Sequence, residues 1–219
     1  MKTASETLEV YQGQFGQYTI TSEDLQGVKI YRLGLLLSAF SFALGSGLIL
    51  GQGATSLTLT LLTPLFTSFS LGLGISLITI HIYLIPLHRF LQVCWGIGTL
   101  TAIILSTFSQ DPLALYVYQN PLTLLGIGFI FVALTGIYFK EAFCFNRLET
   151  KLLTPLVPLL LLGHLFGVLS VGIEQALLGT WAGLFIIFAL RKSIQPLIPD
   201  IGDKSVFTYL KQQRSASVS

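Results

Sequence analysis

Apolar residues along this chain gather into six long stretches that contain no Asp, Glu, Lys or Arg. The first five hold 18 or more residues each, and a helix of 18 to 20 residues spans about 27–30 Å, the thickness of a bilayer core. The sixth is shorter, but Arg191 and Lys192 follow it, and such long side chains can reach the headgroups. The stretches are Leu33–Leu50, Leu57–Ile80, Phe90–Phe108, Pro121–Phe139, Leu152–Val171 and Ala176–Leu190.

This pattern predicts an all-α polytopic membrane protein with six transmembrane helices. An N-terminal tail (residues 1–32) precedes the membrane domain (residues 33–190), and a C-terminal tail (residues 191–219) follows it. Composition agrees, because 53% of residues are hydrophobic, 10% are charged and the mean hydropathy is +0.77. A soluble protein of this size needs a much larger charged fraction to cover its surface.

The basic residues indicate which way the helices run. All twelve Lys and Arg lie in the two tails and in the second and fourth connections. The other connections, Gly51–Ser56, Ser109–Asn120 and Gly172–Gln175, contain none and carry only Asp111 and Glu174. Positive charge concentrates on the cytoplasmic side of membrane proteins. We therefore expect both termini to be cytoplasmic.

The fourth connection, "KEAFCFNRLETK", is unusually rich in charge for this chain. Its basic residues act as topology determinants in the simplest interpretation. A second interpretation is an ion-paired latch between the second and fourth connections, and a third is a docking site for a partner. The residues concerned are His88, Arg89, Lys140, Glu141, Arg147 and Glu149. Ion pairs of this kind contribute little where they are solvated.

The second apolar stretch places small, mostly hydroxylated residues on one helix face, at spacings of three and four. They are Thr60, Thr63, Thr67, Ser70 and Gly74, and the first four carry the hydroxyl groups. Such a face permits close helix packing, and hydroxyl groups can bond to a neighbouring backbone. A polar permeation path is the alternative. Gly47 and Gly51 have GxxxG spacing, which also favours helix packing.

His164 is the one strongly titratable residue expected deep inside a span. Ionisable residues within the membrane are candidates for function. The flanking glycines of "GHLFG" leave room for a flat ring, so His164 is a candidate ligand for a chlorophyll-type pigment. A structural hydrogen bond is the alternative. A bis-histidine haem is disfavoured, because His81 and His88 fall near the opposite boundary of the membrane.

The tails carry signals for local structure. In "TSED", Thr21 stands three residues before Asp24, as in a capping box, so a helix is predicted to begin near Ser22 and to continue into the first span. In the C-terminal tail, a turn is predicted at Asp200–Asp203 and a short helix from Lys204.

Signatures of enzymes and metal sites are absent from the sequence. There is no HExxH motif, no pair of intramembrane aspartates and no phosphate-binding loop. Cys94 and Cys144 stand alone, without metal-type spacing. We expect no enzymatic activity, no metal and no nucleic-acid partner.

Several phrases carry a family resemblance: "YQGQFGQYTIT", "TIHIYLIPLHR", "LTGIYFKEAFCFNRLETKLLTPLVPLLLLGH" and "PDIGDKSVFTYLK". Together they resemble a family of uncharacterised integral membrane proteins found chiefly in cyanobacteria. The resemblance implies residence in a bacterial plasma membrane or thylakoid. It brings no catalytic residues, because the family has no assigned activity.

These observations favour a non-enzymatic scaffold or assembly factor of a photosynthetic membrane, which docks photosynthetic membrane proteins through its cytoplasmic face. A small transporter or channel that uses the Thr/Ser face of the second helix is the first alternative. A pigment-binding protein that uses His164 is the second. Apart from the lipid bilayer and such a pigment, the sequence indicates no ligand.

Overall fold

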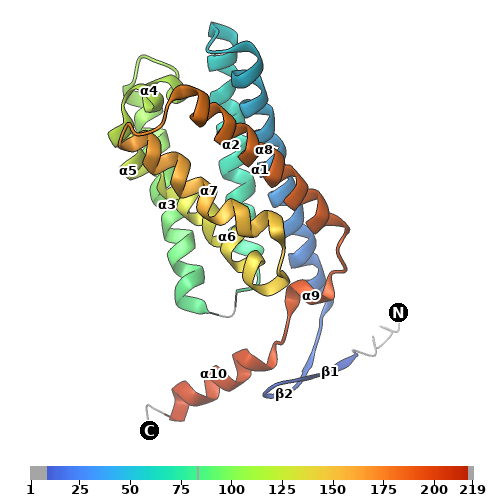
Figure 1. Ribbon diagram of the computed structural model, residues 1–219. Helices are drawn as coiled ribbons and strands as arrows, with labels where there is room; N and C mark the ends of the chain where they lie inside the picture. Colours follow the sequence, from blue (N-terminus) through green and yellow to red (C-terminus); the bar gives the residue numbers. More distant parts are fainter. Residues whose placement is uncertain (1–8, 83, 217–219) are drawn as a thin grey trace, which may run out of the picture.

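The six apolar stretches form long helices that lie side by side (Figure 1). The computed structural model describes residues 9–216 except residue 83. The long helices are α1 (Ser22–Gln52), α2 (Ser56–Thr79), α3 (Ile85–Phe108), α6 (Phe129–Phe145), α7 (Leu148–Leu165) and α8 (Val171–Ile194). The prediction of an all-α multi-pass membrane protein is confirmed.

Within the described residues, five helices are individually long and apolar enough to cross a membrane. A bent pair of helices, Pro121–Ile127 and Phe129–Phe145, passes the same test only when taken together, and its two parts meet at an angle of 59°. This bent pair corresponds to the predicted fourth span, and the number of candidate spans is six if the pair is counted as one.

Shorter elements lie at the two ends of the bundle. They are β1 (Val10–Gly13), β2 (Gly16–Thr19), α4 (Leu113–Gln119), η1 (Pro121–Thr123), α5 (Leu124–Ile127), α9 (Ile198–Ile201) and α10 (Ser205–Ala216). The hairpin β1–β2 and the helices α9 and α10 mark what we call the terminal end. The α1–α2 connection and α4 mark the opposite end, which we call the far end (Figure 1).

Contacts between the long helices close a ring. Helix α1 packs between α2 and α8, α7 packs between α8 and α6, and α3 packs against both α6 and α2. Large side chains fill the centre of the ring, and Trp181, Phe185 and Tyr138 are almost completely buried. Aromatic residues therefore supply much of the core that holds the helices in register.

Helices α1 and α2 approach each other closely. A Cβ atom added to Gly34 would lie 2.6 Å from the carbonyl oxygen of Gly72, and one added to Gly72 would lie 2.6 Å from that of Gly34. Ser38 lies beside them and donates to the carbonyl of Phe69 at 3.0 Å. The predicted GxxxG pair is not used in this way, because the space around Gly47 and Gly51 is open.

The boundary between α7 and α8 differs from the prediction. Helix α7 ends at Leu165, and Gly167 turns the chain with a φ of +64°. Helix α8 begins at Val171, so Gly172–Gln175 forms its first turn rather than a connection. The apolar run continues across this corner without a charge, so a hydropathy pattern does not reveal the break between the two helices.

The start of α1 is as predicted. Thr21 and Asp24 form a capping box, with the Thr21 hydroxyl accepting from the Asp24 backbone N–H at 3.3 Å. The predicted helix in the C-terminal tail is also present, as α10. Arg191 and Lys192 belong to α8 rather than to the tail.

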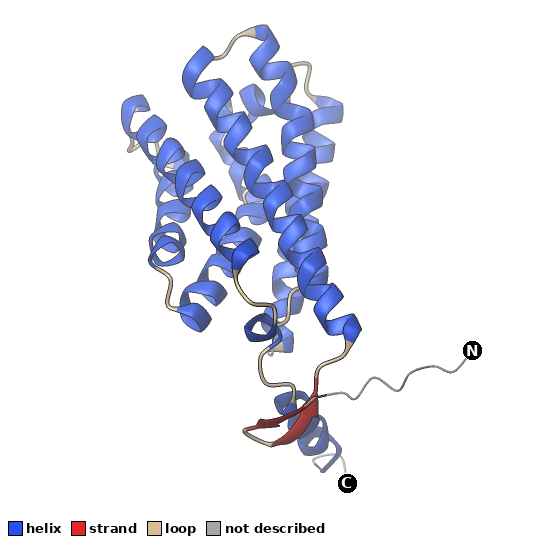
Figure 2. Cartoon of the chain, turned by 90° about the vertical axis from the view of Figure 1, so that its right-hand side faces the viewer, coloured by secondary structure: helices blue, strands red, loops and turns tan. Residues whose placement is uncertain are grey.

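The hairpin β1–β2 is not predicted by the sequence analysis, and it packs against α10 (Figure 2). The ring of Phe15 stacks on Tyr209 with centroids 4.1 Å apart, and the Phe15 N–H donates to Ser205 Oγ at 3.0 Å. The N-terminal and C-terminal segments therefore form one unit beyond the terminal end of the bundle.

Candidate binding cavity and buried ion-pair network

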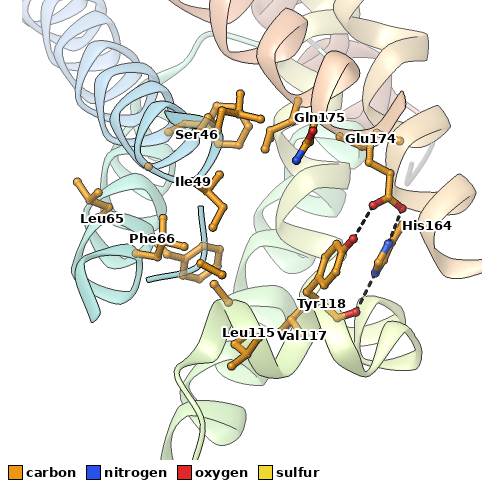
Figure 3. Close-up of a pocket in the computed structure, with 18 of the residues that line it drawn as sticks. Ser46, Ile49, Leu65, Phe66, Leu115, Val117, Tyr118, His164, Glu174 and Gln175 are labelled. Carbon is orange, nitrogen blue, oxygen red and sulfur yellow. Dashed lines mark hydrogen bonds and ion pairs between the residues drawn. The ribbon is translucent and has the colours of Figure 1, made fainter. Parts of the chain in front are cut away.

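A cavity of about 500 Å³ opens into the far-end half of the helix bundle. Helices α1, α2, α4, α6, α7 and α8 all contribute to its wall, together with Leu124 of α5. Most lining side chains are apolar, as Figure 3 illustrates with Ile49, Leu65 and Phe66. Such a wall suits hydrocarbon better than water.

The cavity runs from the surface into the core. Leu50 and Val171 at the far end are exposed, whereas Phe69 and Leu160 deeper in the wall are buried. On α1 the lining extends from Ser41 to Leu50, which corresponds to about 14 Å along the helix axis. This is roughly half the thickness of a bilayer core.

Three polar residues close one side of the cavity near its mouth (Figure 3). His164 Nδ1 lies 2.7 Å from Glu174 Oε1, and the Tyr118 hydroxyl donates to Glu174 Oε2 at 2.9 Å. His164 Nε2 lies 3.1 Å from the backbone oxygen of Tyr118, and the two rings stack at 4.6 Å. We call these three residues the polar corner.

Helix ends explain why these residues meet. His164 is in the last turn of α7 and Glu174 is in the first turn of α8. A carboxylate is favoured at a helix N-terminus, because its charge complements the helix dipole. The short helix α4 then brings Tyr118 over the α7–α8 turn.

Tyr118 of the polar corner and Gln175, the neighbour of Glu174 in the chain, can still meet a ligand. Burial and then the hydrogen bond to Glu174 raise the pKa of the Tyr118 phenol, so Tyr118 stays protonated. Gln175 also lines the cavity, and its side-chain amide has no hydrogen-bond partner within the part of the chain that the structure describes. An amide offers both a donor and an acceptor to a bound headgroup.

Charged side chains form a second cluster, at the terminal end. The Lys192 ammonium is almost inaccessible and contacts Glu141 Oε2 at 2.5 Å and the carboxylate of Asp200. Arg32 reaches the same Asp200 carboxylate at 2.7 Å, and Tyr31 donates to Glu141 at 3.2 Å. These residues come from α1, α6, α8 and α9, so the cluster ties four elements together.

Glu149 of α7 extends this cluster. It accepts from Arg191 of α8 at 2.8 Å and lies 3.5 Å from Arg147. Arg147 also donates to the side chain of Gln195 at 2.6 Å. Within the described residues, every buried side-chain nitrogen and oxygen has a hydrogen-bond partner. We call the two groups of ion pairs the buried network.

The chain matches the family described as uncharacterized integral membrane protein (DUF2301) over residues 75–209, more than half of its length. It belongs to this family. None of the curated proteins and none of the solved structures matches the chain. The matched region contains the polar corner and, apart from Tyr31 and Arg32, the buried network.

In this DUF2301 family member, the predicted latch residues do not all converge. Lys140 and Glu141 pair at 2.8 Å within the buried network, to which Arg147 and Glu149 also belong. His88 and Arg89 stand apart from it.

The contacts of His88 and Arg89 lie near the α2–α3 connection. His88 Nε2 lies 2.6 Å from the Leu77 carbonyl oxygen, and Arg89 donates to Gln92 at 3.1 Å. Neither contact reaches the fourth connection, so these contacts do not support the predicted ion-paired link. Glu141 and Glu149 pair with Lys192 and Arg191 of α8, and also with Lys140 and Arg147 of their own connection.

The hydroxylated face of the second helix does not surround a polar path. Thr60 and Thr67 are exposed on the outside of the bundle, and their hydroxyls donate to carbonyls of their own helix at 2.9 and 3.0 Å. Thr63 is half-buried, and buried Ser70 bonds to Thr99 of α3 at 2.9 Å. The contact between Ser70 and Thr99 fits the packing interpretation at that position, whereas Thr60 and Thr67 face outward.

His164 lies at the end of its helix rather than deep inside a span. Both of its ring nitrogens have partners, namely Glu174 and the Tyr118 backbone. A pigment ligand needs one nitrogen free for the metal, so the arrangement favours the structural interpretation of His164. Among the described residues, no group of three or more His, Cys, Asp or Glu side chains could hold a metal ion.

Sequence reasoning missed several residues of the two clusters: Tyr31, Arg32, Tyr118, Lys192 and Asp200. A signal was available for the polar corner. Gly167 followed by Ser170 reads as a helix stop and a helix start, and Glu174 then falls in a first turn. No comparable signal marks Lys192, because a lysine at the end of a span is expected to point toward the headgroups.

Proposed function

We propose that this membrane protein binds an uncharged, amphipathic lipophile from the bilayer in the far-end cavity. The observation that carries the proposal is the combination of an apolar cavity within membrane-spanning helices and a hydrogen-bonding corner at its mouth. A volume of about 500 Å³ falls within the 300–1,000 Å³ range of small-molecule sites. The apolar body of the ligand occupies the cavity, and its headgroup lies near Tyr118 and Gln175.

Charge supports an uncharged headgroup. Every Lys and Arg whose side chain the structure describes lies toward the terminal end, where Lys29, Arg89 and Lys151 stand near the starts of their helices. The cavity mouth instead carries the Glu174 carboxylate. An anionic head at the mouth meets this carboxylate, with no Lys or Arg side chain among the described residues that line the cavity, and that repulsion is strong where water is scarce. Phosphate and carboxylate heads are therefore disfavoured.

Docking through the charged terminal end has less support from the geometry. The exposed fractions of the Lys140, Glu141, Arg147 and Glu149 side chains are 11%, 0%, 13% and 4%. These groups contact one another or α8, which leaves little of their charge for a partner. We propose a binding role rather than a scaffolding or catalytic one.

The terminal end faces the cytoplasm in our proposal, because the basic residues concentrate there. Cys144 allows a direct test, since it is exposed beside the α6–α7 turn whereas Cys94 is buried. A membrane-impermeant maleimide is expected to label Cys144 in inverted vesicles and not in right-side-out vesicles, with Cys144→Ser as the blank. Labelling only in right-side-out vesicles would overturn this orientation. The choice between plasma membrane and thylakoid follows from fractionation of the native cells.

Blocking the cavity tests the binding proposal. Ser46 is buried and lines the cavity, whereas its neighbour Gly47 has open space around the position of a Cβ atom. Ser46→Phe fills the site, and Gly47→Phe adds the same ring on the outside of α1.

Lipids retained by the purified protein are measured by native mass spectrometry. We expect the unmodified protein and Gly47→Phe to retain an uncharged lipophile and Ser46→Phe to lose it. Equal retention by all three proteins, or retention of anionic lipids alone, contradicts the proposal.

A further inference from the structure

A second cavity, of about 390 Å³, lies in the terminal half of the bundle. Leu87 and Phe90 of α3, Phe139 of α6 and Pro158 of α7 are part of its wall. These helices cross the membrane, so the medium beside this cavity is hydrocarbon.

Hydroxyl groups in this wall are already satisfied. Thr135 donates to the carbonyl of Phe131 at 2.7 Å, and Thr154 donates to that of Thr150 at 2.8 Å. Each hydroxyl is thus turned toward its own helix, and the wall offers an occupant only apolar contacts. The chemistry of the wall fits a hydrocarbon chain.

The two cavities share two wall residues, Phe131 of α6 and Leu161 of α7. The ring of Phe131 lies 5.8 Å from that of Phe69 and 5.3 Å from that of Trp181, measured between centroids. Leu161 is half-buried and packs against the core. These two side chains, one from each helix, stand between the far-end cavity and the second cavity.

We infer that Phe131 and Leu161 form a partition that sets how long a hydrocarbon tail the protein accepts. This inference rests on the proposed function, because the tail belongs to the lipophile bound in the far-end cavity. The headgroup stays at the polar corner, and the tail extends inward until it meets the partition. Removal of either side chain joins the two cavities and lets a longer tail continue into the second one.

The energetics predict a measurable cut-off. Affinity is referred to the alcohol free in water, and on that scale each methylene placed in an apolar site contributes about 0.8 kcal/mol, which is about a fourfold gain. Affinity for a homologous series therefore rises by about fourfold per methylene until the tail reaches the partition, and then stops rising. In a partition variant the rise continues for longer tails.

A series of straight-chain fatty alcohols carrying bromine at the tail end provides the probe. Bromine quenches tryptophan fluorescence at short range, and Trp181 contacts the partition residue Phe131. Trp95→Phe removes the other tryptophan, so that the signal comes from Trp181 alone. Affinities are compared for this background and for Phe131→Ala and Leu161→Ala within it.

Phe129→Ala is the matched control, because Phe129 lies on the same helix, is partly buried against the core and lines neither cavity. We expect a cut-off in the background and in the control, and a cut-off at longer tails in both partition variants. Leu161→Ala keeps the test open if Phe131→Ala fails to fold. An unchanged cut-off in the partition variants overturns the partition and leaves the proposed function standing, whereas absence of alcohol binding by the background overturns both.

Discussion

The two ends of this helix bundle handle polar groups in opposite ways. At the terminal end, Lys192 and Glu141 are fully buried and paired inside the protein. At the far end, the polar corner borders a cavity, and Tyr118 is about half exposed. The terminal end therefore acts as a sealed joint, meaning a set of ion pairs that connects helices and is closed to solvent. The far end instead has room for a ligand.

The comparison suggests two uses of polar groups in a membrane protein. Fully buried ion pairs stabilise the fold, whereas partly exposed polar groups beside a cavity can bind a ligand. Ion pairs withdrawn from water need every partner in place, since the attraction only then offsets the loss of solvation. Such a cluster is poorly suited to binding a ligand, because an ion pair would have to break before a new group could bind. A partly open corner tolerates the arrival of a new hydrogen-bonding group, because water or headgroups already reach it.

The largest expected effect follows from removing the ammonium group at the centre of the buried network. Lys192→Met keeps the length of the side chain but leaves Glu141 and Asp200 as buried carboxylates without this partner. We expect a loss of about 3–5 kcal/mol in the free energy of unfolding. Thermal unfolding in mild detergent measures it.

Lys151→Met is the matched control for this prediction, because Lys151 is exposed on α7. We expect that variant to stay within about 0.5 kcal/mol of the unmodified protein. Similar losses in the two variants would show that burial and pairing do not distinguish Lys192, and the description of the terminal end as a sealed joint would fail.

A smaller effect is expected when the polar corner is broken. His164→Leu removes both contacts of the imidazole and leaves Glu174 with Tyr118 alone. Because these side chains are partly solvated, we expect a loss of about 1–2 kcal/mol in the free energy of unfolding. Tyr118→Phe removes one hydrogen bond and should lose less. A loss for His164→Leu that equals the Lys192→Met value would remove the contrast between the two ends.

How much of this architecture the sequence predicts depends on the distance over which a signal acts. Apolar runs and capping residues are local, so the multi-pass helical architecture and the start of α1 at the Thr21–Asp24 box are correctly predicted. The pairing of Lys192 with Glu141 joins residues from different helices. Such a contact depends on how each helix is rotated about its axis, which hydropathy does not determine.

The far-end cavity is hidden from the sequence for a related reason. Its wall combines segments from most of the helices, and the side chains that line it look like ordinary lipid-facing residues. His164 attracts attention because it is ionisable, but its partner Glu174 comes from the next helix. The hairpin β1–β2 is missed because its strands of four residues are too short for alternation to be recognised.

The next smaller effect is expected on ligand selectivity, from the charge of Glu174 at the cavity mouth. If Glu174 disfavours anionic heads, the protein should bind a fatty alcohol more tightly than the fatty acid of equal length. Glu174→Gln keeps the shape of the side chain and should reduce this preference by about tenfold, or ~1.4 kcal/mol. Competition against a brominated alcohol measures both affinities.

Asp111→Asn controls for the far-end charge in that experiment, because Asp111 lies in the α3–α4 connection and does not line the cavity. We expect its preference for the alcohol to match that of the unmodified protein. A preference that is unchanged by Glu174→Gln would mean that something other than this carboxylate selects the headgroup.

The smallest expected effect is local and lies beyond the terminal end, where Asp203 joins the N-terminal hairpin to the C-terminal segment. Its carboxylate accepts from the Gln14 N–H at 2.7 Å and from Ser205. The hydrogen bond from the Ser205 hydroxyl, followed by that from the Gln14 backbone, lowers the pKa of Asp203. A group whose pKa is lowered by folding stabilises the fold above its unfolded pKa and loses this contribution as pH falls through the folded value.

Hydrogen exchange at the Gln14 amide, corrected for the intrinsic effect of pH, should therefore slow as pH rises through the acidic range and then remain slow. Asp203→Asn should exchange faster at neutral pH, because the amide group accepts more weakly than a carboxylate. Glu23→Gln, at an exposed position on α1, should leave the profile unchanged. Protection that is indifferent to both pH and Asp203→Asn would mean that the Phe15–Tyr209 stack alone holds the two segments together.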